Sequence, residues 1–292
     1  MVGVGTRWEG LLIVGALAAG STFSVASWAQ TSVNQIPQPP VGMLVPHGPL
    51  SSYAVLNGLL TALVIVLLAR EAWRNRSAFP LAFLVAGALA GLVEPIFDGN
   101  IHVWFAQPSD SATYHFYNVP YPWYEMPGNS VLGGPIYWMY LKFQRGITTR
   151  GLWGYFLLWW LADTLWEIPG TTMEAYAYYG PQPFLISGFP LWVGMLAGLG
   201  IPLAGYAAHA LRDVLVGARL WLMVVILIPV VVYGSEVIAW PMWITLNGGQ
   251  GLVVTHLAAL VSLAFTASAY YFLTLRYAKA QAMPAAARQA AA

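Results

Sequence analysis

Carboxyl groups at helical spacing are the feature of this sequence that could do chemistry. Asp163 and Glu167 are four residues apart, as are Glu94 and Asp98, and residues at positions i and i+4 share one face of a helix. Glu236 is the one acid in a long apolar run. A buried carboxyl group without a cationic partner favours its protonated form, which is the form that a general acid requires. We therefore predict a catalytic acid–base site made by these five residues, with Asp163 and Glu167 as its central pair.

Other roles for the acids stay open from the residues alone. Asp163 and Glu167 could join helices through hydrogen bonds to tryptophan, tyrosine and backbone donors. Glu125 is close to a proline and could be a helix break or cap, while Asp110 and Glu174 are predicted to be solvated loop residues. Ionisable groups inside a membrane are nevertheless costly and usually face a cavity or a partner, which favours the functional interpretation.

Aromatic residues accompany the acids along the chain. The segment Tyr114–Tyr124 is rich in tyrosine, tryptophan and histidine, more than anchoring at a membrane interface needs. We predict that the substrate-binding residues include Tyr176, Tyr178, Trp166, Trp240, His102, Trp104 and Trp123.

Composition places these residues in a membrane protein. Of the 292 residues, 59% are hydrophobic and only 8% are charged, whereas a soluble domain carries about 25% charged residues. Most of the surface must therefore face lipid. A net charge of +1 gives no electrostatic footprint for nucleic acid, and the absence of cysteine excludes disulfides and thiolate chemistry. The partners that we expect are membrane lipid and a lipophilic small-molecule substrate, with a homo-oligomer left open.

The elements that must position these residues are membrane-spanning helices, which need about 20 apolar residues each. Apolar runs occur at 8–29, 51–69, 79–98, 151–168, 188–211, 220–240 and 251–275, with a poorer one at 124–141. If all of them cross in alternation, the 12 basic residues fall on one side, which the positive-inside rule makes cytoplasmic. We predict an all-α polytopic bundle of seven or eight transmembrane helices in the cytoplasmic (inner) membrane. Its C-terminus is then cytoplasmic, and the site opens toward the acidic and aromatic outer loops.

The predicted organisation has four parts. Residues 1–29 form either a first transmembrane helix or a signal peptide. Residues 30–50 are a proline-rich outer linker, 51–278 a single transmembrane bundle, and 279–292 a disordered alanine-rich tail.

Proline and glycine predict where helices end and where they pack. Pro95 and Gly99 are expected to end the third helix early, and Pro169 to end the helix that carries the central acid pair. The pairs Gly87–Gly91 and Gly194–Gly198 have the spacing of close helix packing.

Several other chemistries lack the residues that they require. A retinal protein needs a lysine within its last helix, but Lys142 and Lys279 both lie at predicted cytoplasmic ends. None of the five histidines has the clustered spacing of a di-iron desaturase, and neither a paired aspartate motif for magnesium pyrophosphate nor a phosphate-binding glycine loop occurs. We therefore expect no metal and no cofactor. Carboxyl acid–base chemistry on an uncharged, lipophilic substrate remains.

The stretch 167–192 carries a family resemblance. Glu167 at a helix end is followed by a Tyr-x-Tyr loop with Tyr176 and Tyr178, and then by Pro190 ahead of the next helix. This pattern resembles that of the AveC-like spirocyclase family of multi-pass membrane proteins, and more loosely that of membrane carotenoid hydratase-like proteins. The resemblance implies closure of spiroketal rings on polyketides, in which two hydroxyls join a ketone with loss of water. Glu167, Tyr176 and Tyr178 are the positions that match.

We therefore expect a membrane-embedded enzyme of secondary metabolism. It would catalyse acid-catalysed cyclisation of the spiroketal type, or hydration, of a polyketide-like or terpenoid-like substrate. The alternative is a proton-coupled transporter or an accessory membrane subunit that uses the same buried acids. A transporter is expected to contain inverted repeats with paired broken helices.

Overall fold

The computed structural model describes residues 36–44, 47–106, 113–116 and 119–282. Residues from Pro37 onward form one compact unit. The predicted first helix or signal peptide at 1–29, the first part of the linker, Asp110 and the tail residues 283–292 lie outside the described residues.

The described chain is mostly helical. Its longer helices, in chain order, are α2 (His47–Asn75), α3 (Phe79–Ala90), α4 (Glu94–Ile101), α6 (Gly133–Gln144), α7 (Thr149–Thr172), α8 (Leu191–Ala210), α10 (Ile228–Glu236), α11 (Trp240–Asn247) and α12 (Leu252–Ala282). Shorter helical turns are α5 (Glu125–Gly128), η3 (Asn129–Leu132), η4 (Gly217–Arg219), α9 (Leu220–Leu222), the π-helical turn η5 (Met223–Leu227) and η6 (Val237–Ala239). Helix α2 begins inside the predicted linker, and α12 continues to Ala282 because its last residues are good helix formers.

Four helical segments of the described chain are long and apolar enough to cross a membrane. They are Ser52–Asn75, Leu191–Ala210, Gly217–Asn247 and Leu252–Ala282. A fifth is present if α3 and α4, which meet at a bend of 43°, count as one broken span. Helices α6 and α7 are not among them, since α6 has only 12 residues and α7, although long enough, is not apolar enough. A total of seven or eight crossings therefore remains a prediction.

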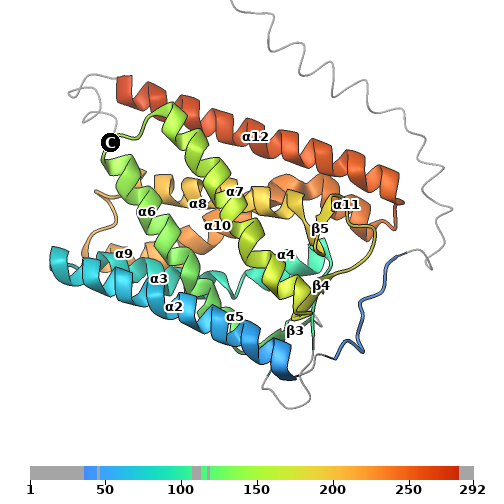
Figure 1. Cartoon of the computed structure of the whole chain (residues 1–292). Coiled ribbons are helices and arrows are strands. Elements are labelled where there is room, and N and C mark those ends of the chain that lie inside the picture. Colours follow the sequence, from blue (N-terminus) through green and yellow to red (C-terminus); the bar gives the residue numbers. More distant parts are fainter. Residues whose placement is uncertain (1–35, 45–46, 107–112, 117–118, 283–292) are drawn as a thin grey trace, which may run out of the picture. The chain divides into compact units, whose positions relative to one another are not determined.

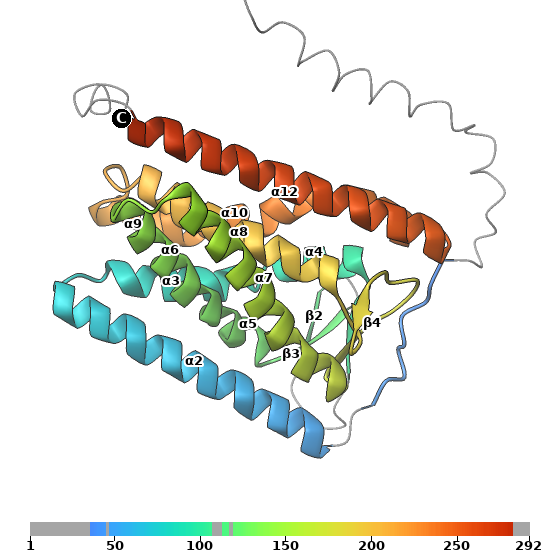
Figure 2. The same ribbon diagram turned by 45° about the horizontal axis from the view of Figure 1, so that its top comes forward.

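The helices are arranged with α2 and α12 on opposite sides and α3, α6, α7, α8 and α10 between them (Figures 1 and 2). The most buried span is α8, which packs against α6, α7, α10 and α12. Glycines permit this close approach: a Cβ added at Gly198 would lie 2.9 Å from the carbonyl oxygen of Phe156, and one at Gly205 would lie 2.6 Å from Cβ of Met139. Gly87 and Gly91 likewise face Asn129, so both predicted glycine pairs lie at packing contacts.

Short strands depart from the all-α prediction. β1 (Val103–Phe105) pairs with β4 (Tyr176–Tyr178), β2 (Thr113–Phe116) with β3 (Val119–Pro122), and β5 (Leu185–Ile186) with β6 (Phe189–Pro190), all antiparallel. They gather at the end of the unit where α2 begins (Figures 1 and 2). Two of these pairs are local hairpins, whereas β1–β4 joins loops that are distant in sequence, which no short-range pattern indicates.

Two predicted helix ends are wrong. Helix α7 continues past Pro169 to Thr172, because the hydroxyls of Thr171 and Thr172 donate to the carbonyl oxygens of the preceding turn. The break between α3 and α4 falls at Gly91–Val93 rather than at Pro95, which lies in the first turn of α4. Proline is compatible with a first helical turn because the amide hydrogen that it lacks has no partner there.

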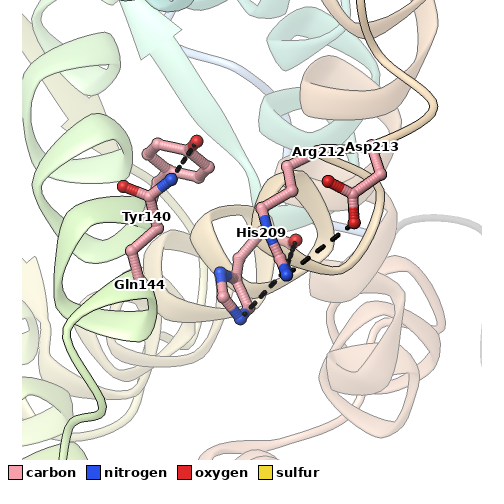
Figure 3. Close-up of polar contacts among 5 residues, drawn as sticks. All are labelled: Tyr140, Gln144, His209, Arg212 and Asp213. Carbon is pink, nitrogen blue, oxygen red and sulfur yellow. Dashed lines mark hydrogen bonds and ion pairs between the residues drawn. The ribbon is translucent and has the colours of Figure 1, made fainter. Parts of the chain in front are cut away.

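The basic residues of the described helices lie at the end of the unit opposite the strands. The end of α2, the turn between α6 and α7, the segment after α8 and the end of α12 lie together there (Figures 1 and 2). Figure 3 shows how α8 terminates in this region. Arg212 donates to the carbonyl oxygen of His209 at 2.8 Å and lies 3.7 Å from the carboxylate of Asp213. An arginine bonded to the last carbonyls stabilises a helix C-terminus, so this cluster has a structural explanation.

Candidate functional site

A cavity of about 380 Å³ lies between the helices and receives residues from α2, α4, α7, α8 and α10. Six carboxyl groups line it, from Glu94, Asp98, Glu125, Asp163, Glu167 and Glu236. Among the described residues that line it, none is lysine, arginine or histidine. All five predicted catalytic carboxyl groups thus share one cavity, together with Glu125, for which a break or cap role had also been considered.

Three of these acids lie where the helix geometry is irregular. Glu94 is the first residue of α4, directly after the bend. Glu125 opens α5, and Glu236 closes α10 immediately before the 3-10 turn η6. Within membranes, backbone that departs from a regular helix is tolerated where it lines a cavity or is buried in protein. The breaks in regular helix geometry and these three acids therefore lie in the same part of the structure, at the cavity.

Glu167 is held by two tyrosine hydroxyls. Tyr176 donates to its Oε2 atom at 2.8 Å and Tyr178 donates to the same atom at 3.1 Å. Both tyrosines lie on β4, where residues i and i+2 point to the same side. The pairing of Phe105 with Tyr176 and of Val103 with Tyr178 positions this strand. The Tyr-x-Tyr pattern is therefore the geometry of a two-donor clamp on one carboxylate oxygen.

Asp163 differs from Glu167 in its surroundings. It lies one turn earlier on α7 and also lines the cavity. Among the described residues, no side chain donates a hydrogen bond to it. The two acids thus share a helix face but are chemically distinct, since one is a fixed acceptor and the other is available to a ligand.

A second network fixes Glu94 and Asp98. The amide nitrogen of Asn129 donates to Glu94 Oε2 at 2.5 Å, and its amide oxygen accepts from the hydroxyl of Tyr233 at 2.8 Å. Tyr121 donates to Asp98 Oδ2 at 2.7 Å. Burial, together with the neighbouring Asp98 carboxyl, raises the pKa of the Tyr121 hydroxyl well above its ordinary value, so this hydroxyl remains a donor.

Aromatic rings form much of the remaining wall. The ring of Tyr53 lies 5.9 Å from that of Tyr176 and 6.1 Å from that of Trp166, measured between centroids. All three residues line the cavity, as do Phe105 and Tyr178. Carboxyl groups and aromatic faces therefore look onto the same space.

Of the predicted substrate-binding residues, Tyr176, Tyr178 and Trp166 line the cavity, whereas Trp104 and His102 do not. Trp104 lies between Val103 and Phe105 on β1, and alternate strand residues face opposite sides, so its neighbours reach the cavity and it does not. His102 caps α4 in the left-handed conformation, and its ring stacks on that of Tyr179 at 4.7 Å. Burial lowers the pKa of His102.

Trp123 and Trp240 are also outside the lining. Trp123 is 59% exposed. Trp240 is 50% exposed and its ring lies near that of Phe265. The 3-10 turn η6 separates Trp240 from Glu236, so the four-residue spacing does not place them on one face.

Sequence reasoning missed several residues that complete the site, namely Tyr53, Asn57, Asn129, Trp159 and Tyr233. Tyr233 had a usable signal, because it precedes Glu236 by three residues on the same helix. Asn129 had none, since its contacts with Glu94 and Tyr233 join segments far apart in the chain.

Within the part of the chain that the structure describes, no group of three histidine, aspartate or glutamate side chains is arranged to hold a metal ion. Comparison with protein-family models, curated proteins and solved structures finds no match to this chain. The site therefore has to be interpreted from its own geometry.

Proposed function

We propose that this protein is a membrane-embedded enzyme that performs acid-catalysed ring closure of the spiroketal type, or hydration, on a lipophilic polyketide-like or terpenoid-like substrate. The observation that carries the proposal is the cavity in which six carboxyl groups and aromatic faces meet with no basic residue among its described lining. Its volume lies within the range of small-molecule sites, about 300–1,000 Å³. The resemblance to AveC-like spirocyclases favours the cyclisation branch.

Asp163 and Glu167 supply the acid and the base in this proposal. Asp163 donates a proton to the substrate ketone while a substrate hydroxyl attacks the carbonyl carbon and gives up its proton to Glu167. Glu167 then protonates the hemiketal hydroxyl, which leaves as water and yields an oxocarbenium ion. A second hydroxyl closes the other ring and gives its proton to Asp163, which restores both carboxyl groups. The balance is a dihydroxyketone converted to a spiroketal and one water.

The cavity walls fit this sequence of charges. Aromatic faces stabilise a nearby cation, and Tyr53, Tyr176 and Trp166 are positioned around the cavity to do so for the oxocarbenium ion. The clamp of two tyrosines orients Glu167 for proton transfer. Enclosure among helices limits access of water, which would reopen the ring.

The proposed topology places this cavity toward the non-cytoplasmic side. It adds α6 and α7 to the candidate spans and the segment 8–29 as a further crossing or a signal peptide, for seven or eight in all. The basic end of the unit is then cytoplasmic by the positive-inside rule. A lipophilic substrate would enter from the membrane.

The test is turnover of a synthetic long-chain dihydroxyketone by purified protein, with the uncatalysed rate subtracted. Asp163→Asn and Glu167→Gln retain shape and polarity, and loss of a general acid or base lowers rates by about 10²–10⁴-fold. Glu174→Gln is the matched control, because Glu174 is exposed and outside the cavity. Wild-type rates in both folded cavity variants would remove this pair from the mechanism.

A proton-coupled transporter is the second candidate, and one observation favours it. Breaks in helical geometry coincide with Glu94 and Glu236, and discontinuous helices around a buried site are typical of secondary transporters. Reconstituted protein that moves protons across liposomes together with a lipophilic solute, without converting it, would support this candidate over the enzyme.

A further inference from the structure

Three buried acceptor atoms in the cavity wall have no hydrogen-bond donor within the described chain. They are Oε1 of Glu125, Oε2 of Glu236 and Oδ1 of Asn57. The two glutamates are each only 8% exposed and Asn57 is 4% exposed. A buried polar atom without a partner is unfavourable, so these atoms point to a ligand that brings donors or positive charge.

The surroundings select between those two kinds of ligand. Within the described part of the chain, the lining contains six carboxyl groups and no lysine, arginine or histidine to balance them. Aromatic rings from Tyr53, Trp166, Tyr176 and Tyr178 share the wall, and aromatic faces attract cations most strongly when desolvated. An anionic ligand would meet only carboxyl groups, whereas a cation supplies the positive charge that the described lining lacks and favours the ionised form of those groups.

We propose that this cavity binds lipophilic organic cations, such as quaternary ammonium compounds and protonated tertiary amines, with the positive charge between the unpartnered glutamates and the tyrosine and tryptophan faces. The binding site does not depend on the proposed reaction. If that reaction also occurs, such cations mimic its oxocarbenium ion and inhibit it.

The test compares phenyltrimethylammonium with tert-butylbenzene, its neutral isostere, on full-length protein in lipid nanodiscs. Binding is measured by saturation-transfer NMR, with empty nanodiscs as the blank. We expect saturable binding of the ammonium compound. The hydrocarbon should bind at least about tenfold more weakly, because contact between a cation and a carboxylate in a desolvated site raises the affinity by more than about tenfold. Equal binding of the two compounds would overturn the proposal, as would no saturable binding of the cation.

Variants locate the site. Glu236→Gln and Glu125→Gln should each weaken binding of phenyltrimethylammonium by about tenfold. The control Glu174→Gln removes an exposed acid and should change the affinity by less than about twofold. Thermal unfolding in the same nanodiscs identifies any variant that fails to fold. One folded glutamate variant is enough for the comparison with the wild-type protein. If the folded Glu125→Gln and Glu236→Gln proteins both bind phenyltrimethylammonium with wild-type affinity, the assignment is overturned. Cation binding without dihydroxyketone turnover would reject the proposed reaction and support this inference. Turnover without cation binding would support the reaction and reject this inference.

Discussion

Tyr176 reaches Glu167 only because residue 170 has no side chain. A Cβ added at Gly170 would overlap the hydroxyl and the adjoining ring carbons of Tyr176. That hydroxyl donates to Glu167 Oε2 at 2.8 Å. Gly170 lies within α7, and its role is to admit the tyrosine that holds the acid.

Gly170→Ala should displace Tyr176 and separate it from Glu167. Overpacking of a buried contact costs about 1–3 kcal/mol, so we expect a lower thermal unfolding temperature and a loss of activity. Gly154→Ala is the matched control on the same helix, because nothing lies within 4 Å of a Cβ at that position. That control should be stabilising by about 0.5–1 kcal/mol. A Gly170→Ala protein as stable and active as wild type would contradict the packing described here.

Removing the clamp hydroxyls should affect chemistry more than folding. Tyr176→Phe and Tyr178→Phe each take one donor from Glu167 and retain the ring. A hydrogen bond to a charged group contributes about 1.5–3 kcal/mol, so turnover of the dihydroxyketone should fall by about tenfold or more in each variant. Tyr271→Phe, at a 51% exposed position on α12, should change nothing. Turnover equal to wild type in the double clamp variant would show that Glu167 does not need its donors.

Asn129 connects Glu94 to Tyr233, and replacing its amide with a carboxyl group tests that bridge. Asn129→Asp removes the donor to Glu94 and adds a like charge in a buried position. We expect destabilisation of about 1–3 kcal/mol, the usual penalty of an unsatisfied buried polar group, measured by thermal unfolding in nanodiscs.

Asn75→Asp is the comparison for this change, since Asn75 also donates to a glutamate, Glu71, but at an exposed site. Repulsion between exposed acids four residues apart is only about 0.2–0.5 kcal/mol. Equal losses in the two variants would mean that burial of the Asn129 bridge contributes nothing.

The predicted orientation can be measured with reporters. One fused after Ala292 should be cytoplasmic, and one inserted at 107–112 should be external, because the basic helix ends and the strand-bearing end lie at opposite ends of the unit (Figure 1). Cysteines introduced between Lys142 and Arg150 should react only with membrane-permeant reagents. Labelling of that segment from outside would reverse the topology and place the cavity toward the cytoplasm.

Composition and periodicity alone determined that this is a helical protein with apolar, membrane-compatible helices. The i,i+4 spacing of Asp163 and Glu167, the scarcity of charge and the segregation of acids from bases were enough to predict that five carboxyl groups share a site. These inferences hold because helix faces and charge segregation are local properties of the chain. The Tyr-x-Tyr pattern predicted a loop with two substrate-binding tyrosines, whereas in the structure both lie on strand β4 and donate to Glu167.

Tertiary structure decided what surrounds those acids. Asn129, Tyr53 and Glu125 reach the cavity through contacts between segments far apart in sequence, which no local pattern encodes. Trp104 and Trp240 are excluded from it by a strand alternation and a 3-10 turn that spacing alone does not reveal. Helix α7 passes through Pro169 because the hydroxyls of Thr171 and Thr172 bond to carbonyl oxygens of the preceding turn. Local sequence specifies which face a residue takes, and only packing specifies what that face meets.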